Sequence, residues 1–313
     1  MTTGLALLGG LVLLFVAGEL LVRGSVALAI RLGVSPLMIG LTVVGFGTSM
    51  PELVTSLQAA VAGVPGIALG NIVGSNIANV LLILGIAALV CPILCPVRTV
   101  TRDGGLMLAA ALVLLALTAE GMLSRFDGVL LVLALAGYLW FVWHQERRHP
   151  PSEDVTGGSK PRAGPAGALL DVGLVLLGFL GLVVGARLLV SGAVDLAAIL
   201  GVSDTIIGLT VVAVGTSLPE LATSLVAALR RQPEIAYGNI VGSNIFNVLG
   251  IAGVTAFAHP LSVPAEIVRF DLPLMIGVIL VMTIFAATGS RVTRAEGATL
   301  FIGYCAYVAV VMI

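Results

Sequence analysis

The sequence predicts an all-α polytopic membrane protein, in which ten transmembrane helices form two inverted five-helix repeats. Three observations carry this prediction: an apolar composition, ten long apolar runs, and a pair of motifs that occurs twice at one offset. Of the 313 residues, 59% are hydrophobic and 10% are charged, whereas soluble proteins carry about 25% charged residues. This composition disfavours a soluble enzyme, a nucleic-acid-binding protein and a secreted disulfide scaffold.

The apolar runs have lengths close to the roughly 20 helical residues that cross a bilayer. They are continuous rather than alternating, so they do not fit a transmembrane β-barrel. The first run contains Glu19 and Arg23 and lacks a basic segment before it, so we expect a spanning helix and not a cleaved signal. The expected helices are 4–29, 37–63, 67–90, 104–119, 127–144, 170–199, 205–229, 235–258, 270–287 and 296–312.

A polar segment rich in proline and glycine separates the fifth run from the sixth. It predicts a short linker at 145–168 between a first five-helix repeat, 1–144, and a second, 169–313. The linker is too short to form a regulatory domain.

The two halves are related by internal duplication. A shift of 168 residues places Gly40–Leu53 on Gly208–Leu221 with 11 of 14 positions identical, and Gly70–Val80 on Gly238–Val248 with 10 of 11 identical. Transporter folds commonly contain such repeats. The motif helices are those expected at 37–63, 67–90, 205–229 and 235–258.

The basic residues predict the orientation in the membrane. Eleven of the fifteen fall in loops on one side and two in loops on the other, a bias that places the richer side in the cytoplasm. We therefore expect both termini outside and the linker inside, in the inner membrane of a prokaryote. Because each half has an odd number of helices, the second repeat is inverted relative to the first.

Two acids lie at mid-membrane depth, Glu52 and Glu220, at equivalent positions of the two repeats. A carboxylate at the bilayer centre costs at least about 2–3 kcal/mol unless it is paired, so each is a functional candidate. The repeat relation predicts that they face each other near the midplane.

Each acid follows a glycine, two hydroxyl residues and a proline. Proline at 51 and 219 removes an amide donor and frees the carbonyl four residues earlier, at Gly47 and Gly215. We expect helices 2 and 7 to be broken here, with oxygens directed at a ligand, because such backbone survives in a membrane only when it is buried or lines a cavity. The accompanying hydroxyls belong to Thr48, Ser49, Thr216 and Ser217.

The second motif adds neutral oxygens on helices 3 and 8, which we also expect to be broken. Within each repeat a serine and an asparagine four residues apart share one helical face. Together with the two acids they form a ligand set for hard cations, since Ca²⁺ takes 6–8 oxygens and softer metals prefer sulfur or imidazole. These residues are Ser75, Asn79, Ser243 and Asn247.

Charge balance favours antiport. One Ca²⁺ or two monovalent ions neutralise two carboxylates, so one pocket holds either load but not both. An empty site with two uncompensated charges in a low dielectric resists reorientation. Competition for shared ligands is therefore sufficient to couple opposite fluxes.

The repeated GTSxPE and GNIVGSN segments closely resemble the α-repeats of the calcium/cation antiporter superfamily, specifically prokaryotic sodium/calcium exchangers. The resemblance extends over nearly the whole chain. It implies exchange of Ca²⁺ for Na⁺ by alternating access, with long helices 1 and 6 sliding across the other eight. It implies no enzymatic activity and no cofactor beyond the transported ions. The net charge of −1 gives no electrostatic attraction for nucleic acid. The expected partners are the lipid bilayer and the transported ions, with no obligate protein partner.

The resemblance also assigns ligands. The central calcium ligands would be Glu52 and Glu220. Hydroxyls that bind calcium or sodium would come from Thr48, Thr216, Ser49 and Ser217. Backbone carbonyls that complete sodium sites would be those of Gly45 and Ala213. The same cavity would be lined from helices 3 and 8 by Ser75, Asn79, Ser243 and Asn247.

One departure from the family pattern concerns charge. Some members carry an acid at the position of Asn247, whereas Asn79 and Asn247 are both amides here. This weakens the case for potassium co-transport and leaves the number of sodium ions open. Proton-coupled relatives typically place a glutamate in the segment aligned with GNIVGSN, and none is present.

The sequence thus predicts an electrogenic sodium/calcium antiporter. The alternative is the same fold coupled to H⁺ or exporting Mg²⁺ or Mn²⁺. A passive cation channel and an organic-anion permease are further alternatives, the latter opposed by the acids at the predicted site. Outside the motifs, Glu19 and Arg23 are expected to neutralise each other as an interfacial pair.

Overall fold

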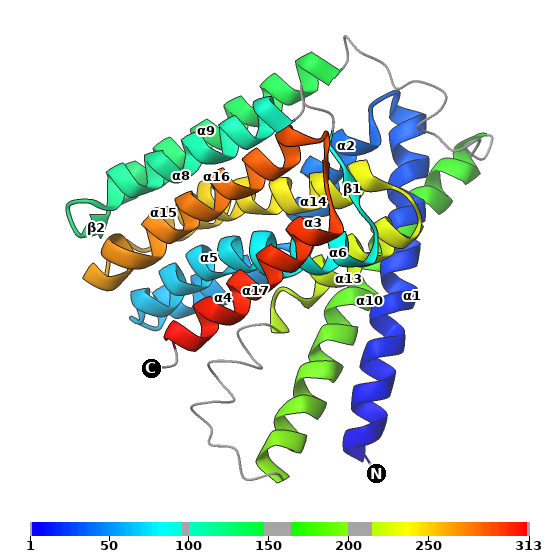
Figure 1. Cartoon of the computed structure of the whole chain (residues 1–313), viewed down its shortest axis with the longest axis horizontal. Helices are drawn as coiled ribbons and strands as arrows, with labels where there is room; N and C mark the ends of the chain where they lie inside the picture. Colours follow the sequence, from blue (N-terminus) through cyan, green and yellow to red (C-terminus); the bar gives the residue numbers. More distant parts are fainter. Residues whose placement is uncertain (1, 96–99, 147–163, 200–214, 312–313) are drawn as a thin grey trace.

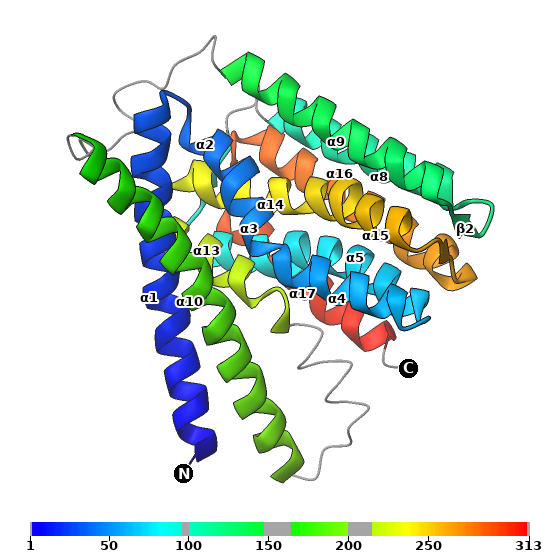
Figure 2. The ribbon, with the colours of Figure 1, turned by 180° about the vertical axis from the view of Figure 1, so that it is seen from behind.

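The computed structural model describes residues 2–95, 100–146, 164–199 and 215–311. These residues form a bundle of helices, with two long helices lying across one side of it (Figure 1). The two long helices are α1 (Thr2–Leu32) and α10 (Gly164–Ile199). They run side by side in both views and extend beyond the bundle (Figure 2).

The first half contributes four further helical segments, several of which contain a wider π-helical turn (η). Predicted helix 2 is α2 (Pro36–Ile39), η1 (Gly40–Val44), α3 (Gly45–Thr48) and α4 (Met50–Val61). Helix 3 is α5 (Pro65–Ala78), η2 (Asn79–Leu84) and α6 (Gly85–Val90). Helix 4 is η3 (Val100–Gly104) and α8 (Gly105–Thr118), and helix 5 is α9 (Arg125–Glu146).

The second half repeats this order. The described part of helix 7 includes α13 (Leu218–Leu229), and helix 8 is α14 (Pro233–Ile245), η6 (Phe246–Ile251) and α15 (Ala252–Ala258). Helix 9 is η7 (Ile267–Asp271) and α16 (Leu272–Thr288), and helix 10 is α17 (Arg294–Val311). The linker between the repeats and the first part of predicted helix 7 lie outside the described residues.

Four two-residue strands tie loops of one half to loops of the other. β1 (Ile93–Leu94) pairs antiparallel with β4 (Arg291–Val292), and β2 (Met122–Leu123) pairs with β3 (Leu261–Ser262). At the offset of 168 residues β3 is the counterpart of β1, yet the two strands belong to different sheets. β1 and β2 lie at opposite ends of the bundle in Figure 1. An inverted duplication predicts this exchange.

The motif helices 3 and 8 form the centre of the bundle. Within their most apolar stretches 83% of residues of Pro65–Val90 and 89% of Pro233–Ala258 are buried, against 22–39% for the other described spans. The prediction that these two helices are broken is wrong. Each runs continuously through a π-helical turn, because its only proline stands at the first residue, where no intrahelical amide bond is lost.

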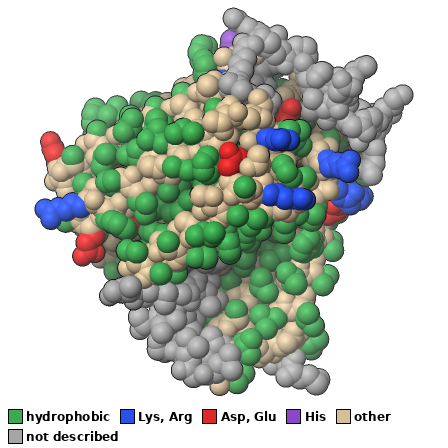
Figure 3. Space-filling model, viewed as in Figure 1, with side chains coloured by type: hydrophobic (Ala, Val, Ile, Leu, Met, Phe, Trp, Pro, Cys, Tyr) green, Lys and Arg blue, Asp and Glu red, His purple; other side chains and the backbone are tan. Residues whose placement is uncertain are grey.

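The described residues contain seven helices long and apolar enough to cross a membrane, or eight when the bent pair Pro36–Thr48 and Met50–Val61 is one span. This is an all-helical multi-span protein, and the count of ten helices stays a prediction. Figure 3 shows hydrophobic side chains over a wide area, with charged side chains near the left edge and on the right.

Helices α1 and α10 pack with their backbones in close contact. A Cβ atom added at Gly178 would lie 2.7 Å from the backbone nitrogen of Leu21, and one added at Gly10 would lie 2.6 Å from that of Leu189. Small residues permit this approach inside a membrane. At one end Arg31 forms an ion pair of 2.7 Å with the buried carboxylate of Asp171. The two helices therefore form one tightly joined unit.

The expected ion pair between Glu19 and Arg23 is present on α1. A third residue joins it, since Arg230 at the end of α13 donates from Nε to Glu19 Oε2 over 2.6 Å. The cluster therefore connects the long helix pair to helix 7, which the spacing of Glu19 and Arg23 alone did not indicate.

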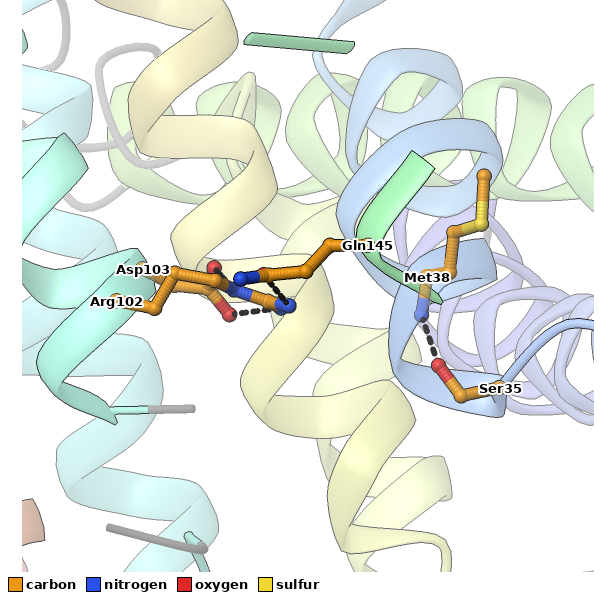
Figure 4. A network of polar contacts seen from close by, with 5 residues as sticks. All are labelled: Ser35, Met38, Arg102, Asp103 and Gln145. Carbon is orange, nitrogen blue, oxygen red and sulfur yellow. Dashed lines mark hydrogen bonds and ion pairs between the residues drawn. The ribbon is translucent and has the colours of Figure 1, made fainter. Parts of the chain in front are cut away.

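Figure 4 shows polar contacts at helix ends, one between two helices and one within a helix. Arg102 of η3 pairs with the buried Asp103 and donates to Gln145 at the end of α9 over 2.7 Å. Ser35 caps α2, its hydroxyl accepting from the Met38 amide over 3.1 Å. Such N-caps satisfy an amide that has no intrahelical partner.

The contact between α1 and α10 predicts opposite effects of alanine at two glycines of α10. Alanine favours a helix over glycine by about 1 kcal/mol. A Cβ at Gly173 meets no atom within 4 Å, whereas one at Gly178 would lie 2.7 Å from Leu21. We expect Gly178→Ala to lower the melting temperature of the purified protein and Gly173→Ala to leave it unchanged or raise it. Equal melting temperatures for both variants would contradict the close packing.

Candidate cation site between the two repeats

The backbone breaks at the same place in both repeats, directly before the acidic helices. Ser49 precedes α4 with φ −84° and ψ 7°, and Ser217 precedes α13 with φ −89° and ψ 7°. Each helix then carries its proline within the first two residues. In the first repeat the helix axis turns by 43° at this point. The expected break in helix 2 is therefore observed; for helix 7 the structure shows the same backbone angles at Ser217, while residues 205–214 lie outside its described part.

The breaks bring each serine to the acid of the other repeat. Ser49 Oγ donates to Glu220 Oε1 over 2.9 Å, and Ser217 Oγ donates to Glu52 Oε1 over 3.2 Å. Thr216 also interacts with the Glu52 carboxylate. Both glutamates are 1% exposed, and their charges interact. The two acids thus share one buried site and do not point into lipid.

Helix 8 closes the site from one side. Ser243 Oγ donates to the backbone carbonyl of Gly45 over 3.2 Å, so this carbonyl faces the second repeat. Thr48 is buried, and its hydroxyl contacts the carbonyls of Val44 and Gly45 at 3.0 and 3.4 Å. The expected Gly45 oxygen is therefore at the site, while Ala213 lies outside the described residues.

The asparagines of the second motif stand in the π-helical turns. Asn79 begins η2, which packs against α13, and Asn247 lies in η6, which packs against α4. Each asparagine is therefore carried to the acidic helix of the opposite repeat. Ser75 and Ser243 are buried one turn earlier on the same helices.

Several buried oxygens at the site have no hydrogen-bond partner. They include one carboxylate oxygen of each acid, and native interiors leave few such atoms unsatisfied. An oxygen that accepts no hydrogen bond is free to bind a cation. Those that belong to expected site residues are Glu52 Oε2, Glu220 Oε2, Asn79 Oδ1 and Asn247 Oδ1.

Asn76 and Asn244, which follow Ser75 and Ser243 in the chain, also have a buried and unpaired Oδ1. Each donates from Nδ2 to a carbonyl of its own helix, that of Ile72 or Ile240, which leaves Oδ1 unpaired. The signal was present in the sequence, because both belong to the repeated GSN segment. They lie one residue after Ser75 and Ser243 and not four, so the rule that residues four apart share a helical face did not indicate them.

The ligand set is mostly neutral. Among the described residues no group of three or more His, Cys, Asp or Glu side chains gathers where it could hold a metal. Two carboxylates with hydroxyl, amide and carbonyl oxygens suit hard cations such as Ca²⁺ and Na⁺. Because the site has only two fixed negative charges, it suits a cation that is bound and released again rather than one that is held permanently.

Comparisons with known proteins agree with this geometry. The family model described as "Sodium/calcium exchanger protein" matches residues 3–144 and 170–313. The sodium/calcium exchanger MaX1 of Methanosarcina acetivorans is 35% identical over 343 residues, covering 98% of this chain and 97% of that protein. The inner membrane protein YrbG of Escherichia coli is 37% identical over 263 residues, covering 83% and 81%.

Solved structures give the same result. The sodium-calcium exchanger NCX_Mj, soaked with 10 mM Na⁺ and no Ca²⁺, superimposes with a TM-score of 0.86 at 31% identity, and the match covers 98% of both chains. The structure soaked with Na⁺ and Sr²⁺ gives a TM-score of 0.85. From the motifs, the fold and these matches it follows that the chain is a multi-pass membrane transporter of the sodium/calcium exchanger family.

Proposed function

We propose that this chain exchanges Ca²⁺ for Na⁺ by alternating access at one shared oxygen site. The observation that carries the proposal is the crossed pair of hydrogen bonds from Ser49 to Glu220 and from Ser217 to Glu52. It makes two acids and both serine-containing breaks part of a single site. Each acid retains one unpaired oxygen for a cation.

The roles of individual residues follow from this geometry and from the family resemblance. Glu52 and Glu220 bind Ca²⁺, and the hydroxyls of the two breaks bind Ca²⁺ or Na⁺. The Gly45 carbonyl, and by repeat symmetry that of Ala213, completes sodium sites. The remaining cavity oxygens come from Ser75, Asn79, Ser243 and Asn247.

Burial supports alternating rather than continuous access. Both acids are 1% exposed, so an ion reaches them only after a rearrangement. Two buried carboxylates without a cation carry a large desolvation penalty. A loaded site therefore reorients more readily than an empty one, which couples the two fluxes. The joined helices α1 and α10, packed against α13, are the moving unit.

The proposed topology is a pair of inverted five-helix repeats, 1–144 and 169–313, in a prokaryotic inner membrane. The exchanged strand pairs support the inversion, and the two matched segments, 3–144 and 170–313, support the division. The distribution of basic residues supports external termini and a cytoplasmic linker.

Neutralising either central acid should abolish exchange. Glu52→Gln and Glu220→Gln each remove one of the two charges that balance Ca²⁺. We expect sodium-driven ⁴⁵Ca²⁺ uptake into everted vesicles to fall to background in both variants. The matched control is Glu120→Gln, an exposed glutamate in a turn, with wild-type uptake expected. Full activity in both site variants would remove the central role of the acids.

Sodium should compete with calcium in a fixed ratio. Because one Ca²⁺ and two Na⁺ carry the same charge, two or more Na⁺ must leave before one Ca²⁺ binds. In equilibrium ⁴⁵Ca²⁺ binding to purified protein, we expect the apparent Kd for Ca²⁺ to rise with Na⁺ concentration with a log–log slope of at least two. A slope near zero in Na⁺, together with a strong dependence on pH or on Mg²⁺ or Mn²⁺, would favour the alternative antiporters.

Transport should also be electrogenic. If more than two Na⁺ move per Ca²⁺, each cycle carries net charge, and one charge moved across 100 mV corresponds to about 2.3 kcal/mol. In liposomes with purified protein, we expect an imposed membrane potential to change the rate of sodium-dependent calcium flux. A rate indifferent to potential indicates electroneutral exchange, and single-channel currents without a counter-ion requirement indicate a channel.

A further inference from the structure

Asn239, on helix 8, lies directly behind the candidate site and is fully buried. Its Nδ2 group donates to the backbone carbonyl of Glu220 over 3.3 Å and to Ser224 Oγ over 2.9 Å. These two bonds join helix 8 to helix 7 at the acid itself.

The first repeat contains the same arrangement. Asn71 Nδ2 donates to the backbone carbonyl of Glu52 over 3.1 Å and to Ser56 Oγ over 2.9 Å. Asn71 is the counterpart of Asn239 at the offset of 168 residues. Because both repeats contain the same pair of hydrogen bonds, this arrangement is a regular part of the repeat structure.

The amide oxygen of Asn239 contacts a residue of the first repeat. Thr48 Oγ1 lies 3.1 Å from Asn239 Oδ1 and donates to it. The direction of the amide is fixed, because turning it over would place Oδ1 against the Glu220 carbonyl oxygen, and two acceptors repel. The hydrogen bond to the Glu220 carbonyl therefore orients the Asn239 amide so that its acceptor oxygen, Oδ1, faces the Thr48 hydroxyl.

A hydroxyl has one hydrogen and two lone pairs, so it binds a cation only when its hydrogen points to another acceptor. Thr48 has four acceptors in reach, namely the Glu220 carboxylate, Asn239 Oδ1 and the carbonyls of Val44 and Gly45. A hydrogen directed at the Gly45 carbonyl or at the Glu220 carboxylate would occupy an oxygen that is proposed as an ion ligand. Asn239 Oδ1 is an acceptor outside the proposed ion ligands, so a hydrogen directed at it leaves the Thr48 hydroxyl oxygen, the Glu220 carboxylate and the second lone pair of the Gly45 carbonyl able to face the cation.

We propose that Asn239 is a positioning residue that sets the direction of the Thr48 hydroxyl and thereby the affinity of the site for Na⁺. The inference rests on the proposed function and names a control of sodium affinity within that site. Asn239 does not contact the ion. It acts through Thr48, and its contacts belong to both repeats.

A double-mutant cycle tests this role. The variants are Asn239→Leu, which has a similar shape without hydrogen bonds, Thr48→Val, which loses the hydroxyl, and the two combined. Sodium affinity is measured by displacement of ⁴⁵Ca²⁺ from purified full-length protein. We expect Asn239→Leu to weaken Na⁺ binding about fivefold, the factor that corresponds to one net hydrogen bond. The double variant should bind Na⁺ no more weakly than Thr48→Val alone, since coupled residues are not additive.

Ser224→Ala separates positioning from helix packing. It removes one of the two bonds that join helices 7 and 8 but leaves the Glu220 carbonyl to orient Asn239. We expect a lower melting temperature with Na⁺ affinity close to that of the wild type. Should Asn239→Leu not fold, Asn239→Ala, which only removes atoms, replaces it in the cycle.

Additive effects of the two substitutions would overturn the inference, as would unchanged Na⁺ affinity in the Asn239 variant. Loss of Na⁺ affinity in Ser224→Ala equal to that in Asn239→Leu would overturn it too, because packing alone would then explain both. A wild-type protein that binds neither ⁴⁵Ca²⁺ nor Na⁺ would instead contradict the proposed function.

Discussion

The structure depends on holding two like charges together inside a bundle that excludes water. Glu52 and Glu220 would repel each other and carry a large desolvation penalty if they stood alone. Each is instead hydrogen-bonded by a serine of the opposite repeat, Ser217 or Ser49. Neither repeat can satisfy its own acid in this way, so the site exists only when both repeats are packed together.

This requirement explains which helices are central. Helices 3 and 8 carry the amide oxygens of Asn79 and Asn247 to the acidic helix of the other repeat, and they are the most buried spans described. Their polar residues avoid lipid because the surrounding helices cover them, as intramembrane polar groups require. The acidic helices are short, begin directly after the serine that donates to the acid of the other repeat, and carry a proline at their second residue.

The long pair α1 and α10 contrasts with this centre. It is joined internally by close backbone contact at glycines and by the Arg31–Asp171 ion pair. Its contact with helix 7 includes the exposed cluster of Glu19 with Arg230, and exposed ion pairs contribute little stability. The strong contacts within the pair suit the proposed unit that moves as one body.

The sequence by itself determined the class of fold, the duplication and the central acids. Hydropathy located the helices to within a few residues, since the bilayer requires long apolar runs, and a charged Glu52 in such a run has few explanations besides function. Tertiary structure decided what residue spacing cannot express: that helices 3 and 8 continue through π-helical turns without breaking, that Ser49 donates to Glu220 rather than to Glu52, and that Thr48 donates to Asn239. The last two are contacts between residues 171 and 191 positions apart in the chain, and helical periodicity reports only on neighbours within a few turns. These contacts exist only because the two repeats pack against each other.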